Sequence, residues 1–182
     1  EARRWHTSTL LPSGKVLIAG GAVSSGNGTV AEIYDPSLTA ATSFTAAGNM
    51  KVARQGHSAT LLPNGKVLIV GRSNNERGTL DVSTNSTPNF VYSERTTEVY
   101  DPAATAVAPA TPAYWSYGPT LNVGRDSHSA TLMPNSTSNP TKFYLLVSGG
   151  LGGGTTSELL DVTSSATGPW VPLASGNNMA VP

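Results

Sequence analysis

Cysteine is absent from the sequence, and charged residues are scarce. The lack of cysteine excludes disulfide bonds, thiolate metal ligands and cysteine nucleophiles within this chain. Asp, Glu, Lys and Arg make up 12% of the 182 residues, about half of the usual share, and the formal net charge is +0. The chain therefore has no surplus of positive charge for nucleic acid or an anionic membrane surface. No apolar run approaches the roughly 18 residues that a membrane-spanning helix needs.

The remaining composition favours short strands and turns. Hydrophobic residues account for 38% of the chain, which argues against intrinsic disorder. Glycine (19 residues) and proline (13 residues) are frequent, as in chains of short strands joined by turns. No stretch shows apolar residues at the helical spacing of about 3.6. Because Ser, Thr and Asn are abundant while charge is low, we expect an extracellular or cell-surface protein.

An internal repeat dominates the sequence. Each of three units opens with an arginine, a histidine three residues later, an apolar run that ends at proline, and a second apolar run that ends at glycine. A glutamate block and a late aromatic residue follow in each unit. The openings are Arg3–Gly21, Arg54–Gly71 and Arg125–Gly150, the glutamate blocks are Glu32–Pro36, Glu98–Pro102 and Glu158–Val162, and the aromatic residues are Phe44, Trp115 and Trp170.

The repeat predicts a four-stranded antiparallel sheet in each unit. The Pro-Ser-Gly and Pro-Asn-Gly triplets between apolar runs are typical of hairpin turns, where glycine takes a positive φ. The second apolar runs do not alternate with polar residues, so we expect strands that are buried on both faces. In the first unit the strands are predicted at His6–Leu11, Lys15–Ala19, Val30–Tyr34 and about Ser43–Ala46. A single sheet cannot bury both of its faces, so the units must stack, and the radial form of such a stack is the β-propeller.

These motifs resemble the kelch repeat, in the form found in bacterial and fungal proteins of the galactose oxidase type. The resemblance covers nearly the whole chain and implies an all-β, kelch-type propeller fold with three four-stranded antiparallel blades. We assign residues 1–50, 51–121 and 122–182 to successive blades of one partial propeller. Three departures from the pattern are Arg72 in place of a second glycine, Leu160-Asp161-Val162 in place of Tyr-Asp-Pro, and Phe44 in place of tryptophan.

Three blades do not close a ring, because propellers have about 4–8 blades. The chain also begins at Glu1 rather than methionine. We therefore expect further blades in the same chain or in a second copy. Open blade ends would present large apolar faces, so a structural, self-assembling module is one alternative function.

Histidine, glutamate and arginine recur once in each unit, which favours a structural role. A metal site needs ligands that converge on one point, whereas equivalent positions around a wide axis diverge, so we predict no metal site. The arginines have a second interpretation, because kelch proteins often place such residues at the mouth of the central channel, where they bind carboxylates. The structural positions are His6, His57, His128, Glu32, Glu98 and Glu158, and the repeated ligand-binding candidates are Arg54 and Arg125, with Trp5 beside them.

The second unit carries an insertion. His57 follows His6 by 51 residues, but His128 follows His57 by 71 residues. The non-repeated segment Arg72–Arg95 replaces an ordinary loop between the second and third strands, and the resemblance places that loop on the binding face. Long loops on rigid scaffolds often carry function, although an added hairpin is an alternative interpretation. The candidate ligand contacts in this segment are Arg72, Asn74, Asn75 and Arg77.

The resemblance also raises the hypothesis of a copper radical oxidase fragment. Enzymes of the galactose oxidase type hold copper partly through a histidine that follows tyrosine, and they need a tyrosine crosslinked to cysteine. Here the residues before the three histidines are Trp5, Gly56 and Ser127, and cysteine is absent. We therefore expect a non-catalytic module without a cofactor, which binds protein or carbohydrate, with the oxidase fragment as an alternative.

Overall fold

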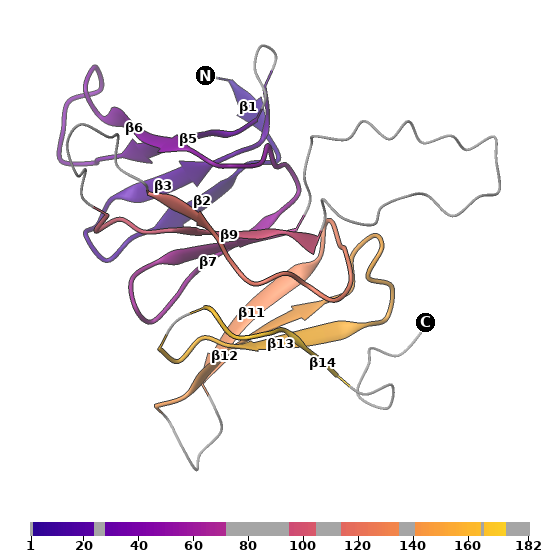
Figure 1. Cartoon of the computed structure of the whole chain (residues 1–182). Coiled ribbons are helices and arrows are strands. Elements are labelled where there is room, and N and C mark those ends of the chain that lie inside the picture. The colour runs from indigo at the N-terminus through magenta and orange to yellow at the C-terminus, as the bar shows by residue number, and fades with distance from the viewer. Residues whose placement is uncertain are drawn as a thin grey trace, which may run out of the picture.

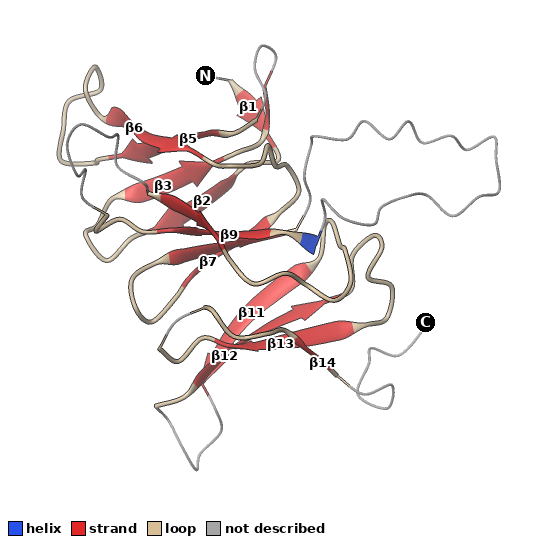
Figure 2. Ribbon diagram, in the orientation of Figure 1, coloured by secondary structure: helices blue, strands red, loops and turns tan. Residues whose placement is uncertain are grey.

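Three four-stranded antiparallel sheets and one short two-stranded sheet make up the computed structural model (Figures 1 and 2). The structure describes residues 2–23, 28–71, 95–104, 114–134, 141–164 and 166–173. Within each large sheet, which we call a blade, the strands are neighbours in chain order. The all-β prediction is therefore confirmed. Among the described residues, no helix has the length and apolar content to cross a membrane.

The strand positions follow the sequence repeat. Blade one contains β2 (Thr7–Leu10), β3 (Val16–Ala19), β5 (Val30–Tyr34) and β6 (Phe44–Asn49). Blade two contains β7 (Ser58–Leu61), β8 (Val67–Val70), β9 (Thr97–Tyr100) and β10 (Trp115–Tyr117). Blade three contains β11 (Ser129–Pro134), β12 (Phe143–Ser148), β13 (Ser157–Asp161) and β14 (Val171–Pro172). The two-stranded sheet joins β1 (Arg3–Arg4) to β4 (Ala22–Val23).

The predicted hairpin turns join the first two strands of blades one and two. Gly14 and Gly65 both have a φ of 81°, which a side chain would disfavour. The Leu11 amide donates to the Lys15 carbonyl, and the Leu62 amide donates to the Lys66 carbonyl, both at 2.8 Å. The two turns are thus closed in the same way.

The middle strand β8 is buried on both faces, as its unbroken apolar run predicts. Val67 and Ile69 belong to the core between blades one and two, whereas Leu68 and Val70 belong to the core between blades two and three. All four side chains are inaccessible to solvent. Alternate residues of one strand therefore hold two neighbouring sheets, because successive side chains point to opposite faces.

The blades converge at their first strands. β7 contacts both β2 and β11, so the first strands of the three blades lie side by side. Indole hydrogen bonds link the blades near their last strands, since Trp115 Nε1 donates to the Ala47 carbonyl and Trp170 Nε1 donates to the Pro119 carbonyl, each at 3.0 Å. Successive sheets packed in this way form part of a β-propeller.

Candidate functional site: the connector face

The chain segments that lead into the first strand of each blade form the candidate site, and we call them connectors. They comprise residues 2–6, 50–57 and 118–128, ahead of β2, β7 and β11. The repeated arginine and histidine of each blade lie in its connector. The side chains that fix these segments therefore decide which groups remain available to a ligand.

An ion pair ties each connector to the third strand of its own blade, and the pair is buried in blades two and three. Arg54 Nε lies 3.1 Å from Glu98 Oε1, and Arg125 Nη2 lies 3.1 Å from Glu158 Oε1, with all four side chains at most 1% exposed. In blade one Arg3 pairs with Glu32, whose side chain is 26% exposed. Burial lowers the pKa of the Arg54 guanidinium, and the Glu98 carboxylate opposes that shift.

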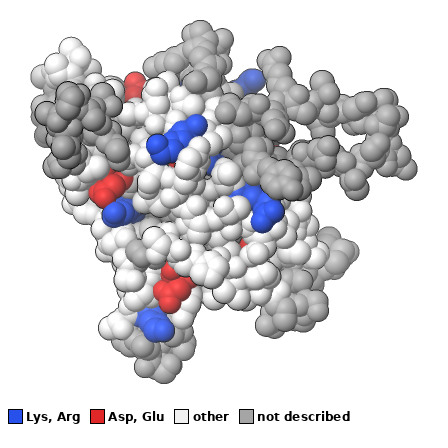
Figure 3. All heavy atoms as spheres, viewed as in Figure 1, with Lys and Arg blue, Asp and Glu red and all other residues white. Residues whose placement is uncertain are grey.

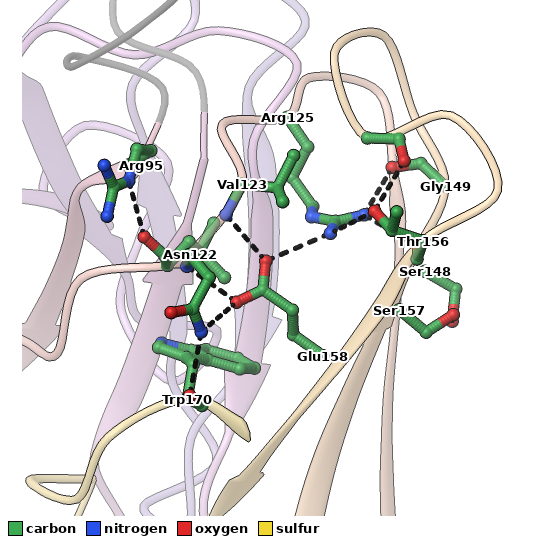
Figure 4. A network of polar contacts seen from close by, with 12 residues as sticks. Arg95, Asn122, Val123, Arg125, Ser148, Gly149, Thr156, Ser157, Glu158 and Trp170 are labelled. Carbon is green, nitrogen blue, oxygen red and sulfur yellow. Dashed lines mark hydrogen bonds and ion pairs between the residues drawn. The ribbon is translucent and has the colours of Figure 1, made fainter. Parts of the chain in front are cut away.

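Each buried carboxylate also accepts two backbone amides from its connector. Glu98 accepts hydrogen bonds from the amides of Lys51 (2.7 Å) and Val52 (3.1 Å). Figure 4 shows the same arrangement in blade three, where Glu158 accepts the amides of Asn122 (2.7 Å) and Val123 (3.0 Å). These hydrogen bonds satisfy oxygens that would otherwise be costly to bury.

The guanidinium groups of Arg54 and Arg125 also donate hydrogen bonds within their own blades. Arg54 Nη1 donates to the carbonyls of Gly71 (2.7 Å) and Thr96 (3.0 Å). Arg125 Nη1 donates to the carbonyls of Gly149 (2.8 Å) and Thr156 (3.1 Å). Because both side chains are fully buried, Arg54 and Arg125 do not face a ligand, and our prediction of them as ligand contacts requires correction.

Two of the repeated histidines lie at blade boundaries. His57 Nε2 is 2.9 Å from the Thr7 hydroxyl of blade one, and His128 Nε2 is 2.9 Å from the Ser58 hydroxyl of blade two. Burial, reinforced by the charge of Arg54, lowers the pKa of His57 to about 3. Burial, reinforced by the charge of Arg125, lowers the pKa of His128 to about 4. Both rings are therefore neutral near pH 7.

The histidines do not converge on one point. His57 and His128 each lie between a different pair of blades, and His6 is exposed on the first connector. In the described part of the chain, no group of three His, Asp or Glu side chains is placed to hold a metal ion. The copper oxidase hypothesis gains no ligand set from these positions.

Gly20 and Gly71, which follow β3 and β8, pack closely against the connector of the next blade. A Cβ atom on Gly20 would lie 2.6 Å from the Arg54 carbonyl oxygen and 2.9 Å from His57 Cε1. A Cβ atom on Gly71 would lie 2.5 Å from the Arg125 carbonyl oxygen and 2.7 Å from His128 Cε1. These positions require glycine because the neighbouring blade's backbone and histidine occupy the space.

Hydrogen bonds between successive connectors were not anticipated from the sequence. The Gly56 amide donates to the Trp5 carbonyl (3.1 Å), and the Ser127 amide donates to the Gly56 carbonyl (3.0 Å). All three residues directly precede a histidine and have a positive φ, of 59° for Trp5, 65° for Gly56 and 52° for Ser127. All three residues occupy the same place before the histidine, but they are Trp, Gly and Ser, so their residue types did not predict these hydrogen bonds.

The loops that follow the second strands begin on the same face as the connectors. Arg3 pairs with Val23 and Arg4 with Ala22 in the β1–β4 sheet. In blade three Asp126 and Leu151 form an equivalent antiparallel bridge. The connectors and the starts of these loops therefore form one surface, which we call the connector face.

Trp5 is the exposed aromatic side chain of the first connector. It is 58% exposed, and the Arg4 guanidinium lies 4.4 Å from the centroid of its ring. An exposed indole beside a cation offers both an apolar surface and a hydrogen-bond donor to a ligand. The other predicted contacts, Arg72, Asn74, Asn75 and Arg77, lie outside the described residues.

Charge is sparse on the molecular surface, as the composition predicts. In the view of Figure 3, blue and red side chains are scattered singly or in small groups among uncharged residues. Two of the ion pairs lie beside the hairpin turns, where Lys15 contacts Asp35 (3.0 Å) and Lys66 contacts Asp101 (2.7 Å). The hydrogen bond from the Ser37 hydroxyl, followed by the hydrogen bond from Lys15, lowers the pKa of Asp35 to about 2.

Comparison with known proteins identifies structural neighbours of the chain but does not assign it to a family. No protein-family model matches the sequence, and no curated protein shows significant similarity to it. A novel fungal alcohol oxidase of the AA5 family, in complex with copper, superposes on 98% of the chain with 15% identity and a TM-score of 0.42. A GH43_12 protein from capybara gut metagenome superposes on 88% with 12% identity and a TM-score of 0.41.

The chain spans less than half of these neighbours, 44% of the fungal oxidase and 28% of the GH43_12 protein. At these identities and scores, the partial propeller assignment rests on the strand order and blade packing described above.

Proposed function

We propose that this chain is a kelch-type propeller segment that acts as a non-catalytic binding or scaffold module of a secreted or surface protein, with a protein or carbohydrate ligand. The observation that carries the proposal is the connector face. Connectors and the starts of the second-to-third-strand loops pair there in both blade one and blade three. The longest non-repeated segment, residues 72–94, follows Gly71 at the equivalent place in blade two.

The connector face has a rigid base. Buried carboxylates, guanidinium groups and interblade hydrogen bonds fix the backbone of the second and third connectors. Loops held by such a scaffold lose less conformational entropy on binding, which favours recognition. The exposed Trp5 and Arg4 give this face an aromatic surface suited to a sugar ring or to an aromatic side chain of a partner protein.

Deletion of residues 74–90 tests the proposal. We expect the shortened chain to lose the binding that the full chain shows on a printed array of oligosaccharides or on a protein array. Its thermal unfolding midpoint should stay unchanged. Trp5→Ala should weaken the same binding to a smaller extent. Leu38→Ala is the matched control, because Leu38 is an exposed apolar residue (47%) in the turn after β5, away from the connectors. Unchanged binding after the deletion would contradict the proposal.

A further inference from the structure

Two side chains of the connector face are attached to a strained backbone. Among the described residues, Trp5 (φ 59°) and Ser127 (φ 52°) are the only ones other than glycine that have a positive φ. Residues with a Cβ atom avoid this left-handed region, and a bulky side chain is rarely found there. Gly56, at the same position of the second connector, adopts a φ of 65° without that cost. The connector backbone therefore requires a conformation that suits glycine best.

Packing within the protein gives little reason for a side chain at either position. Trp5 is 58% exposed, and its contact with the exposed Arg4 side chain stabilises the fold only weakly. Ser127 is also exposed. The backbone hydrogen bonds of Trp5 and Ser127 use main-chain atoms, which glycine would supply equally well. Residues other than glycine in this conformation cluster at ligand-binding sites, so the two side chains point to a role in binding.

The two side chains lie on either side of Gly56. The Gly56 amide donates to the Trp5 carbonyl (3.1 Å), and the Gly56 carbonyl accepts the Ser127 amide (3.0 Å). Both hydrogen bonds lie at the internal boundaries between the three blades. Backbones joined in this way are about 5 Å apart, so roughly 10 Å separates Trp5 from Ser127. Gly56 places no side chain between them, which leaves room for one ring of a ligand.

The groups around Gly56 match the surface of a sugar ring. The Trp5 indole offers a flat apolar face, on which the C–H groups of a sugar can stack. The Ser127 hydroxyl donates to Asp126 Oδ1 (2.5 Å), so its lone pairs remain available to accept a hydrogen bond from a ligand hydroxyl. The chain has a formal net charge of +0 and few charged residues, which favours a neutral ligand.

We infer that Trp5 and Ser127 determine the specificity of a carbohydrate site centred on Gly56. A neutral hexopyranose ring stacks on the indole and donates a hydroxyl hydrogen bond to Ser127. This site rests on the proposed binding role of the connector face, and it selects carbohydrate from the two ligand classes given there. The interblade hydrogen bonds fix the backbone of both residues before the sugar arrives, so less conformational freedom is lost on binding.

Fluorescence quenching tests the indole contact, because Trp5 is exposed whereas Trp115 and Trp170 are at most 4% exposed. The unmodified chain is titrated with iodide in the presence of millimolar cellohexaose, maltohexaose or mannohexaose, in separate experiments. We expect at least one of these sugars to shield Trp5 from iodide. Trp5→Phe is the control, in which quenching should be weak with and without sugar. Shielding by none of the three sugars would overturn the inference.

Isothermal titration calorimetry tests the hydroxyl contact, with the hexasaccharide that shields Trp5 as the probe. Ser127→Ala should bind about tenfold more weakly, which corresponds to the loss of one hydrogen bond. Ser116→Ala is the matched control and should bind like the unmodified chain, because Ser116 is exposed on β10, outside the connector face. Unchanged affinity in Ser127→Ala would overturn the assignment of Ser127.

Thermal unfolding tests the strain with pairs of variants. Ser127→Gly and Ser127→Ala both lack the hydroxyl, but only glycine is at ease with the positive φ, and the same holds for Trp5→Gly and Trp5→Ala. Each glycine variant should unfold about 2–4 °C above its alanine counterpart and bind the hexasaccharide no better. An equal or lower midpoint for the glycine variants would contradict the strain.

The deletion of residues 74–90 distinguishes this site from the proposed function. If the deletion abolishes binding while the Trp5 and Ser127 variants bind normally, the carbohydrate site is overturned and the proposed function stands. Binding of a protein alone, in a manner that depends on Trp5, would also overturn the carbohydrate site.

Discussion

Blade two and blade one contain nearly the same motifs but occupy different environments. In blade two, β8 is buried on both faces, and the Arg54–Glu98 pair is inaccessible to solvent. In blade one, Val16 and Ile18 of β3 are only half-buried, and Glu32 is 26% exposed. The same sequence elements therefore contribute differently to stability according to whether a neighbouring blade covers them, and substitutions in the two blades measure that difference.

The largest difference is expected at the buried ion pairs. Glu98→Gln leaves the buried Arg54 without its counter-charge, so we expect a loss of about 3–5 kcal/mol in the free energy of unfolding, measured by chemical denaturation. Glu32→Gln is the matched variant in blade one, where solvent reaches the carboxylate, and its expected cost is about 1 kcal/mol. Equal costs for the two variants would show that coverage by a neighbouring blade does not set the strength of the pair.

The blade-boundary histidines predict acid sensitivity. The pKa values of His57 and His128 fall from 6.5 to about 3 and about 4, so the unfolded chain binds more protons than the folded chain below pH 6.5. Stability is therefore highest above pH 6.5 and decreases as the pH falls, by about 2 kcal/mol for each histidine at pH 5.

Thermal unfolding of variants between pH 7.5 and pH 5 checks this assignment. His57→Gln should reduce the pH dependence of the unfolding temperature, because it removes a ring whose pKa is lowered by burial. An identical pH dependence in the His57→Gln variant would mean that other groups cause the acid sensitivity.

The smallest difference is expected at the late aromatic residues. Trp115→Phe removes the indole donor to the Ala47 carbonyl and leaves that oxygen buried, which costs about 1.5 kcal/mol. Phe44→Leu in blade one should cost about 0.5 kcal/mol, because this ring is 54% exposed. Calorimetric unfolding of both variants measures the two values, and a larger loss for Phe44→Leu would reverse the comparison between the blades.

Local patterns predicted most of the fold. The Pro-Ser-Gly and Pro-Asn-Gly turns, the apolar runs before Gly20 and Gly71, and the Glu-x-Tyr pattern each act over a few residues, so the strands could be located before the packing was known. The sequence predicted a structural role for the repeated histidines, but it did not identify the hydroxyl groups of Thr7 and Ser58 as their partners.

The candidate site was predicted less well, because exposure depends on tertiary packing. Arg54 stands three residues before its histidine and Trp5 one residue before its histidine, yet Arg54 is fully buried and Trp5 is 58% exposed. Arg54 has counterparts in Arg3 and Arg125, which favours a structural role, whereas tryptophan does not recur at the position of Trp5. The sequence does not give the exposure of either side chain, because that depends on how the blades pack.

The sequence by itself determined that the chain is all-β and that it consists of three repeated four-stranded units. It also determined that the second strand of a unit is buried on both faces. These properties follow from turn residues and hydrophobic patterning within each unit. Only the tertiary structure decided which arginines are buried and which hydroxyl group each histidine meets. Those outcomes depend on residues about a blade apart in the chain, whose contacts arise when neighbouring sheets pack together.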